Sequence, residues 1–132
     1  MSIFALYTAI ATILYLILGY YVMHFRYRYQ VGLGDGGYDA LNRAIRIHAN
    51  FAENVPLLLI LMFLIAQTGV FNAWLHLFGT GLILSRLLHV WGLIRTSGWS
   101  WQRAAGILLT QLLMLIGALY CLWQYVDLNA LF

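Results

Sequence analysis

The polar side chains of residues 42–56 stand out because they open a long apolar stretch of the sequence. Four of them follow one another at intervals of three, four and three residues: Arg43, Arg46, Asn50 and Glu53. On an α-helix, which turns by about 100° per residue, this spacing gathers the four side chains in one stripe about 80° wide. Guanidinium groups bind carboxylates through paired hydrogen bonds, and carboxylates bind ammonium groups. The stripe therefore predicts either a binding site for a small charged molecule or a buried polar clamp.

Further ionisable residues lie in the two apolar stretches that follow. Arg86 and His89 are three residues apart and so share one face of a helix, and Arg103 stands at the start of the last stretch. His48 points away from the stripe and is interpreted as a packing residue. An alternative for Glu53 is that it only neutralises a buried arginine and so holds the helices together.

The composition indicates an integral membrane protein. Of the 132 residues, 64% are hydrophobic and 8% are charged, whereas soluble domains average about 45–50% apolar and about 25% charged residues. A single domain covering residues 1–132 is expected at this length. The net charge of +3 is too modest to indicate a nucleic-acid partner. A lone cysteine, Cys121, rules out an intramolecular disulfide, and no set of converging ligands predicts a metal site.

Four apolar stretches are long enough to cross a bilayer, which takes about 20 helical residues. They are residues 3–23, 39–67, 73–94 and 102–126. The predicted fold is therefore an all-α membrane protein, a bundle of four transmembrane helices. We expect the first helix to be retained rather than removed as a signal peptide, Asp39 to cap the second helix, and Pro56 to kink it.

The distribution of arginine predicts the orientation. The loops after the first and third stretches carry or adjoin five of the seven basic residues, Arg26, Arg28, Arg43, Arg95 and Arg103. The positive-inside rule places both loops in the cytoplasm and both termini outside, in the inner membrane if the host is bacterial. The polar residues of three helices then meet in the cytoplasmic half of the membrane, and this convergence is the main functional signal in the sequence.

One of these motifs resembles a known family. RIHANFAEN, at residues 46–54, resembles the second-helix R-x-H-x-N-x-x-E signature of the MAPEG superfamily, membrane-associated proteins of eicosanoid and glutathione metabolism. RLLH, at residues 86–89, is similar to the Arg-x-x-His of the family's third helix, and Arg103 with Gln111 to the start of its fourth. The likeness covers essentially the whole chain and is strongest to the short bacterial branch. It implies MAPEG-like four-helix bundles that assemble as a homotrimer.

The resemblance also implies a ligand and residues that bind it. Glutathione, as co-substrate, would lie between neighbouring subunits, and the second substrate would be a hydrophobic electrophile or a lipid hydroperoxide that arrives through the membrane lipids. The residues that match the family's glutathione ligands are Arg26, Arg46, Asn50, Glu53 and His89, and Arg103 matches the arginine that stabilises the thiolate. Arg43, His48 and Arg86 are interpreted as structural residues around this site.

Three positions depart from the catalytic members of the family. Ala49 replaces a second basic residue, and Leu93 and Ile107 replace tyrosines. These departures argue against eicosanoid synthesis and leave glutathione binding. The leading hypothesis is thus a membrane-bound glutathione transferase or peroxidase. Two alternatives stay open: a non-catalytic protein that binds glutathione or lipid, and a small proton-coupled exporter with Glu53 as the carrier.

Overall fold

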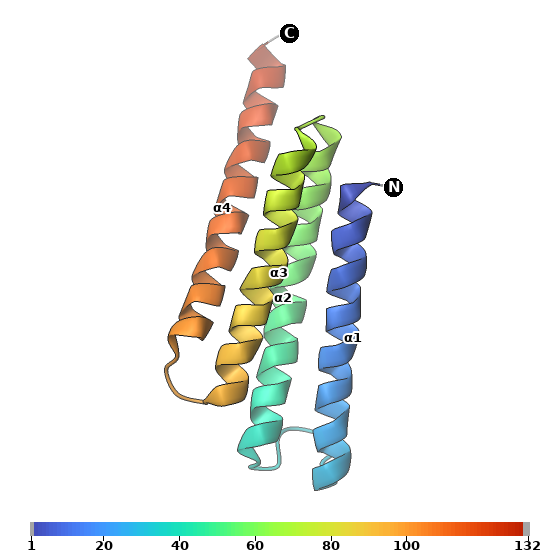
Figure 1. The fold of residues 1–132 in the computed structure, drawn as a ribbon, viewed down its shortest axis with the longest axis vertical. Helices are drawn as coiled ribbons and strands as arrows, with labels where there is room; N and C mark the ends of the chain where they lie inside the picture. Colours follow the sequence, from blue (N-terminus) through green and yellow to red (C-terminus); the bar gives the residue numbers. More distant parts are fainter. Residues whose placement is uncertain (1, 131–132) are drawn as a thin grey trace.

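Four helices that run alternately in opposite directions make up the chain (Figure 1). The computed structural model describes residues 2–130, with side chains up to residue 127, so residues 1, 131 and 132 of the predicted domain lie outside the description. The helices are α1 (Ile3–Tyr29), α2 (Asp39–Gln67), α3 (Asn72–Arg95) and α4 (Trp101–Ala130). Each is long and apolar enough to cross a membrane, so the predicted four-helix membrane fold is confirmed.

The first helix is longer than predicted. It continues to Tyr29 instead of ending at residue 23, and Gln30 then turns into the left-handed region with a φ of 54°. Arg26, in the last turn, donates hydrogen bonds from Nη1 to the carbonyl oxygens of Val31, Gly32 and Gly34. This arginine therefore holds the glycine-rich loop folded back against the end of α1.

The second helix has the predicted bounds, but its N-terminus is not capped as predicted. Asp39 is the first residue of α2. Tyr38 occupies the N-cap position, and its side chain makes no capping hydrogen bond. The Asp39 carboxylate instead accepts a hydrogen bond from Arg43 at 2.6 Å, one turn along, so the expected capping role is wrong. Pro56 lies inside α2, which continues past it to Gln67.

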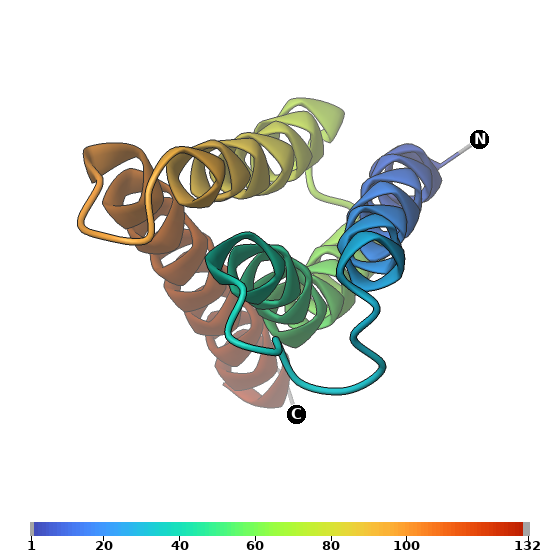
Figure 2. The same cartoon turned by 90° about the horizontal axis from the view of Figure 1, so that it is seen from below.

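α2 occupies the centre of the arrangement (Figure 2). It packs against the other three helices, whereas α1 and α4 lie on opposite sides of it and share no contact within residues 2–130. The loops at residues 30–38 and 96–100 lie together at one end of the bundle, which we call the loop end (Figure 1). The turn between α2 and α3 lies at the opposite end.

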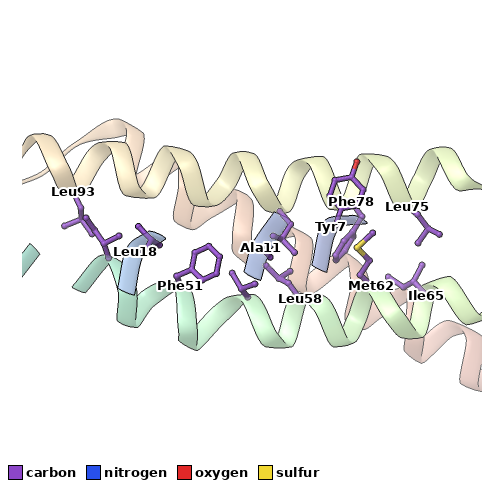
Figure 3. Packing of buried hydrophobic residues seen from close by; sticks show 13 residues of the cluster. Tyr7, Ala11, Leu18, Phe51, Leu58, Met62, Ile65, Leu75, Phe78 and Leu93 are labelled. Atoms are coloured by element: carbon purple, nitrogen blue, oxygen red, sulfur yellow. The ribbon is translucent and has the colours of Figure 1, made fainter. Parts of the chain in front are cut away.

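The core is apolar along the bundle and gains buried polar residues toward the loop end. Apolar side chains of α1, α2 and α3 interlock along the axis and continue to Leu18 and Leu93 (Figure 3). On α3 the buried residues then change from Leu82 to Ser85, Arg86 and His89 as the helix approaches the loop end. Buried polar groups in a bilayer need partners, so this half of the core is where a functional site is expected.

Candidate functional site

A cavity of about 370 Å³ opens at the loop end, among α2, α3 and α4. Its volume lies within the range of about 300–1,000 Å³ that is usual for ligand sites. Its lining residues are Asp39, Asn42, Arg43, Arg46 and Asn50 from α2, His89 and Leu93 from α3, Ser97 from the following loop, and Arg103 and Ile107 from α4. The cavity thus gathers polar residues of the three helices in which the sequence placed them.

The wall formed by α2 carries two arginines with different surroundings. Arg43 is held by Asp39, in the one ion pair found among the described residues. Arg46, one turn further along, is exposed, and no carboxylate within residues 2–130 pairs with it. An arginine without a carboxylate partner retains its full capacity to bind an anion.

A buried hydrogen-bond network lies next to the cavity and is centred on Arg86, whose exposure is only 2%. Its Nη1 donates to Oδ1 of Asn50 at 2.9 Å, its Nε to Oγ of Ser85 at 3.2 Å, and its Nη2 to the carbonyl of Gly106 and the hydroxyl of Thr110. All of these acceptors are neutral. The network joins three helices and leaves a buried positive charge beside the cavity.

His89 is the least satisfied polar side chain in this region. It is 4% exposed and lines the cavity, yet neither Nδ1 nor Nε2 has a hydrogen-bond partner in the part of the chain described. A buried polar group without a partner costs about 1–3 kcal/mol. This cost would be relieved by a hydrogen-bonding group of a ligand inside the cavity.

Two glycines bring Arg103 to the cavity by letting α3 and α4 approach closely. A Cβ at Gly92 would lie 2.6 Å from the backbone nitrogen of Arg103, and one at Gly106 would lie 2.7 Å from the backbone nitrogen of His89. Only hydrogen fits at both crossings. The close contact places the start of α4, and with it Arg103, beside His89.

Besides Arg86, three of the predicted residues do not line the cavity. Arg26 binds carbonyl oxygens of its own loop. His48 packs on α1, with its ring 4.6 Å from that of Tyr15. Glu53 is exposed and makes no ion pair within residues 2–130. Glu53 shares a helical face with Arg46 but lies seven residues, about 10 Å, further along α2 from the loop end.

The structure also reveals residues that the sequence reading did not identify. Gly92, Gly106 and Thr110 position Arg103 and Arg86, and Ser97 lines the cavity. A signal was present in the spacing of small residues. Gly106 and Thr110 are four residues apart, and Ser85 and Gly92 are seven apart, which places each pair on one helical face.

The chemistry available in the cavity is anion binding. Arg46 and Arg103 supply charged donors, and His89 supplies a further polar group. No cluster of three His, Cys, Asp or Glu side chains that could hold a metal ion occurs among the described residues. Leu93 and Ile107 give the same cavity an apolar wall, so a molecule with both charged and apolar parts would fit it.

The chain matches a family model and two curated bacterial proteins. The family model described as "MAPEG family" matches residues 4–123. The inner membrane protein YecN of Escherichia coli strain K12 is 33% identical over 119 residues, which cover 90% of this chain and 89% of that protein. A protein of the same name from a second Escherichia coli strain gives the same values.

Proposed function

The chain belongs to the MAPEG family, and from this premise we propose that it binds glutathione at the loop-end cavity, where a neighbouring subunit completes the site. It is an integral membrane protein with several transmembrane helices. In the proposed conjugation the glutathione thiolate forms a C–S bond with a hydrophobic electrophile and displaces its leaving group, as in a membrane-bound glutathione transferase. In the proposed peroxidase reaction the thiolate cleaves the O–O bond of a lipid hydroperoxide to give the alcohol and glutathione sulfenic acid, which a second glutathione converts to the disulfide and water.

The observation that carries this proposal is a cavity with two arginines, Arg46 and Arg103, for which the described chain provides no carboxylate. Glutathione has carboxylates, which match a guanidinium fork, and a thiol, whose ionised form a guanidinium favours. His89 adds buried ring nitrogens that have no partner among the described residues. A ligand that brings both a carboxylate and a thiol would offer partners to these side chains together.

The positions of Arg103 and the apolar wall suggest how the two substrates meet. A thiol with a pKa of about 8.5 is only a few per cent ionised at neutral pH, and a guanidinium nearby favours the thiolate. We assign the stabilisation of the glutathione thiolate to Arg103. Leu93 and Ile107 line the cavity on α3 and α4, and Ile107 is 40% exposed on the bundle surface. An apolar electrophile would therefore arrive from the bilayer along this wall.

We also propose that the protein is a homotrimer with its loop end in the cytoplasm. Glu53 is an exposed carboxylate on a membrane-spanning helix, and an ionised group facing lipid is costly. A homotrimer, as the family resemblance implies, would cover it with a neighbouring subunit. The arginines near the loop end support a cytoplasmic location of that end by the positive-inside rule. Labelling of a cysteine introduced at Gly34 from the outer face of intact cells would contradict this orientation.

Titration calorimetry with glutathione on the purified protein tests the binding site. Arg46→Ala should weaken binding by about 1–3 kcal/mol, the range for a hydrogen bond to a charged group. Arg103→Ala should weaken binding less, because the proposed role of Arg103 is toward the thiol. Arg95→Ala is the matched control, because Arg95 lies at the same end of the bundle but stacks on Trp91 outside the cavity, at 4.6 Å. Equal affinities in all four proteins would refute the proposed site.

A second candidate function is glutathione binding without turnover. It is favoured by Leu93 and Ile107, which line the cavity where catalytic members of the family carry tyrosines, so no hydroxyl assists the thiol from these positions. Turnover of a chromogenic electrophile distinguishes the two functions. A protein that binds glutathione but does not accelerate conjugation above the rate in solution would belong to the second class.

A further inference from the structure

A second cavity, of about 300 Å³, lies between α1 and α2 and is lined by other residues than the cavity at the loop end. We call it the Pro56 cavity. Two of its lining residues, Thr12 and Tyr15, stand about midway along α1, and two more, Ala52 and Pro56, about midway along α2. Thr12, Tyr15 and Pro56 are exposed, so the cavity opens on the side of the bundle near the middle of the membrane.

The wall of the Pro56 cavity contains a break in the hydrogen bonds of α2. A helical carbonyl accepts from the N–H four residues later, and Pro56 has no N–H, so the carbonyl of Ala52 loses this bond. No side chain within residues 2–127 donates to it instead, and the amide of the nearby Asn54 binds the carbonyl of Asn50. Ala52 and Pro56 both line the cavity, so the break faces it. Hydrocarbon offers no donor, and a ligand that brings one is therefore favoured here.

The two hydroxyl groups in the wall complement the carbonyl of Ala52. Oγ1 of Thr12 donates to the carbonyl of Thr8 at 2.8 Å, so its hydrogen is already used. The hydroxyl of Tyr15 makes no hydrogen bond within residues 2–127, while its ring packs on His48. No charged side chain of the described chain lines the cavity, which disfavours an ionised ligand group. A neutral hydroxyl fits, because it can donate to Ala52 and accept from Tyr15.

We propose that the Pro56 cavity binds a lipid chain that carries a hydroxyl group near its middle, and that this hydroxyl donates a hydrogen bond to the carbonyl of Ala52. The headgroups of ordinary phospholipids lie at the membrane surface, about 15 Å from the centre of the hydrocarbon, and do not reach this depth. A hydroxylated acyl chain brings a donor to the middle of the membrane and covers the apolar wall with its methylene groups. The proposal does not depend on glutathione binding.

The carbonyl of Ala52 can be observed alone because Glu53 is the only glutamate in the sequence. Cell-free synthesis with carbonyl-¹³C alanine and ¹⁵N glutamate labels one Ala–Glu peptide bond, so a magic-angle-spinning N–CO spectrum contains one signal. A hydrogen bond to a carbonyl oxygen moves its ¹³C resonance downfield. The protein is placed in bilayers of a saturated phosphatidylcholine, whose chains carry no hydroxyl.

Three esters of nearly the same length serve as probes: methyl ricinoleate, which has a hydroxyl in mid-chain, its O-methyl ether, and methyl oleate. Methyl ricinoleate should move the Ala52 resonance downfield, and the other two should not, because they have no hydrogen to donate. Titration of the shift should give at least about fivefold tighter binding for methyl ricinoleate than for half-maximal displacement by its ether, as expected for a hydrogen bond that satisfies an otherwise unpaired group.

Pro56→Ala tests whether the missing N–H creates the site. Alanine restores the donor and is favoured over proline inside a helix, so the variant should fold. Its Ala52 resonance should lie downfield without any ester and should not move when methyl ricinoleate is added. Ile60→Ala is the control, because Ile60 lies one turn further along α2, is exposed and does not line the cavity. This variant should respond as the wild type does.

Three results would overturn the proposal. Equal shifts with methyl ricinoleate and its ether would show that the hydroxyl donates nothing to Ala52. A wild-type resonance that no ester moves would refute the site, and a downfield position would then identify a donor from a neighbouring subunit. An equal response in Pro56→Ala and the wild type would show that the missing N–H is not the cause. None of these results bears on the proposed glutathione site.

Discussion

Gly92→Ala tests whether the close approach of α3 and α4 builds the site. The added Cβ would lie 2.6 Å from the backbone nitrogen of Arg103, 2.7 Å from Oγ of Ser100 and 2.9 Å from Cβ of Arg103. Ordinary contact begins near 3.4 Å, so the start of α4 has to move by about 0.8 Å, the difference between 3.4 Å and 2.6 Å. The obstacle is backbone, which no rotation of a side chain can relieve.

The displacement should have two measurable effects. Overpacking of this kind costs about 1–3 kcal/mol of stability, so unfolding in detergent should occur at a lower temperature. Arg103 moves with the backbone, and a misplacement of about 1 Å at a reacting group can reduce the rate about a hundredfold. We expect weaker glutathione binding in calorimetry and, if the protein is an enzyme, a turnover reduced by about ten- to a hundredfold.

Gly32→Ala serves as the control for this substitution. A Cβ at Gly32 would meet nothing within 4 Å, so stability and binding should match the wild type. The reasoning would be refuted if Gly92→Ala melted and bound glutathione as the wild type does. Such a result would mean that α4 does not cross α3 at this point, and that Arg103 is positioned in another way.

Three further predictions address single residues. Arg103→Ala should lower turnover at saturating glutathione by about ten- to a hundredfold, with a smaller change in KM. Raising the pH should partly restore the turnover, because more thiolate forms without the help of Arg103. An undiminished thiolate absorbance in stopped-flow measurements would contradict the role of Arg103. Glu53→Gln should shift native mass spectra in mild detergent from trimer toward monomer, because the neutral glutamine cannot form an ion pair across a subunit interface as the exposed carboxylate could. An unchanged trimer would show that the charge of Glu53 does not support assembly. Arg26→Gln should speed hydrogen exchange in the loop at residues 30–38, whose carbonyls it binds, without changing glutathione affinity; a loss of affinity would return Arg26 to the ligand site.

The helices and their order were predictable because a bilayer imposes a simple requirement on length and polarity. Apolar stretches of about 20 residues separated by polar or glycine-rich segments leave little choice of fold. The end of α1 was not predicted, since Tyr29 and its neighbours are too polar for hydrocarbon but remain helical beyond it. An apolar stretch shows which part of a helix lies in the hydrocarbon. The backbone hydrogen bonds of the helix can continue beyond that part.

The sequence predicted which helices contribute polar residues to the candidate site, but not how these helices cross or which hydrogen bonds join them. Helical spacing predicted that Arg46, Asn50, His89 and Arg103 would meet, and all four line one cavity. Glu53 was predicted with them and is not among the residues that line this cavity, whose extent depends on how α4 crosses α2, and no single-helix pattern contains that crossing. The bonds of Arg86 to Asn50 and Thr110 likewise join residues that are 36 and 24 positions apart, so they become visible only in three dimensions.

A structure of the protein determined at saturating glutathione tests whether glutathione binds in the cavity among α2, α3 and α4. We expect a bound molecule in that cavity, with one carboxylate at Arg46 or Asn50 and its sulfur near the guanidinium of Arg103. Glutathione bound elsewhere on the protein, or a cavity that holds no glutathione under conditions where calorimetry detects binding, would contradict it.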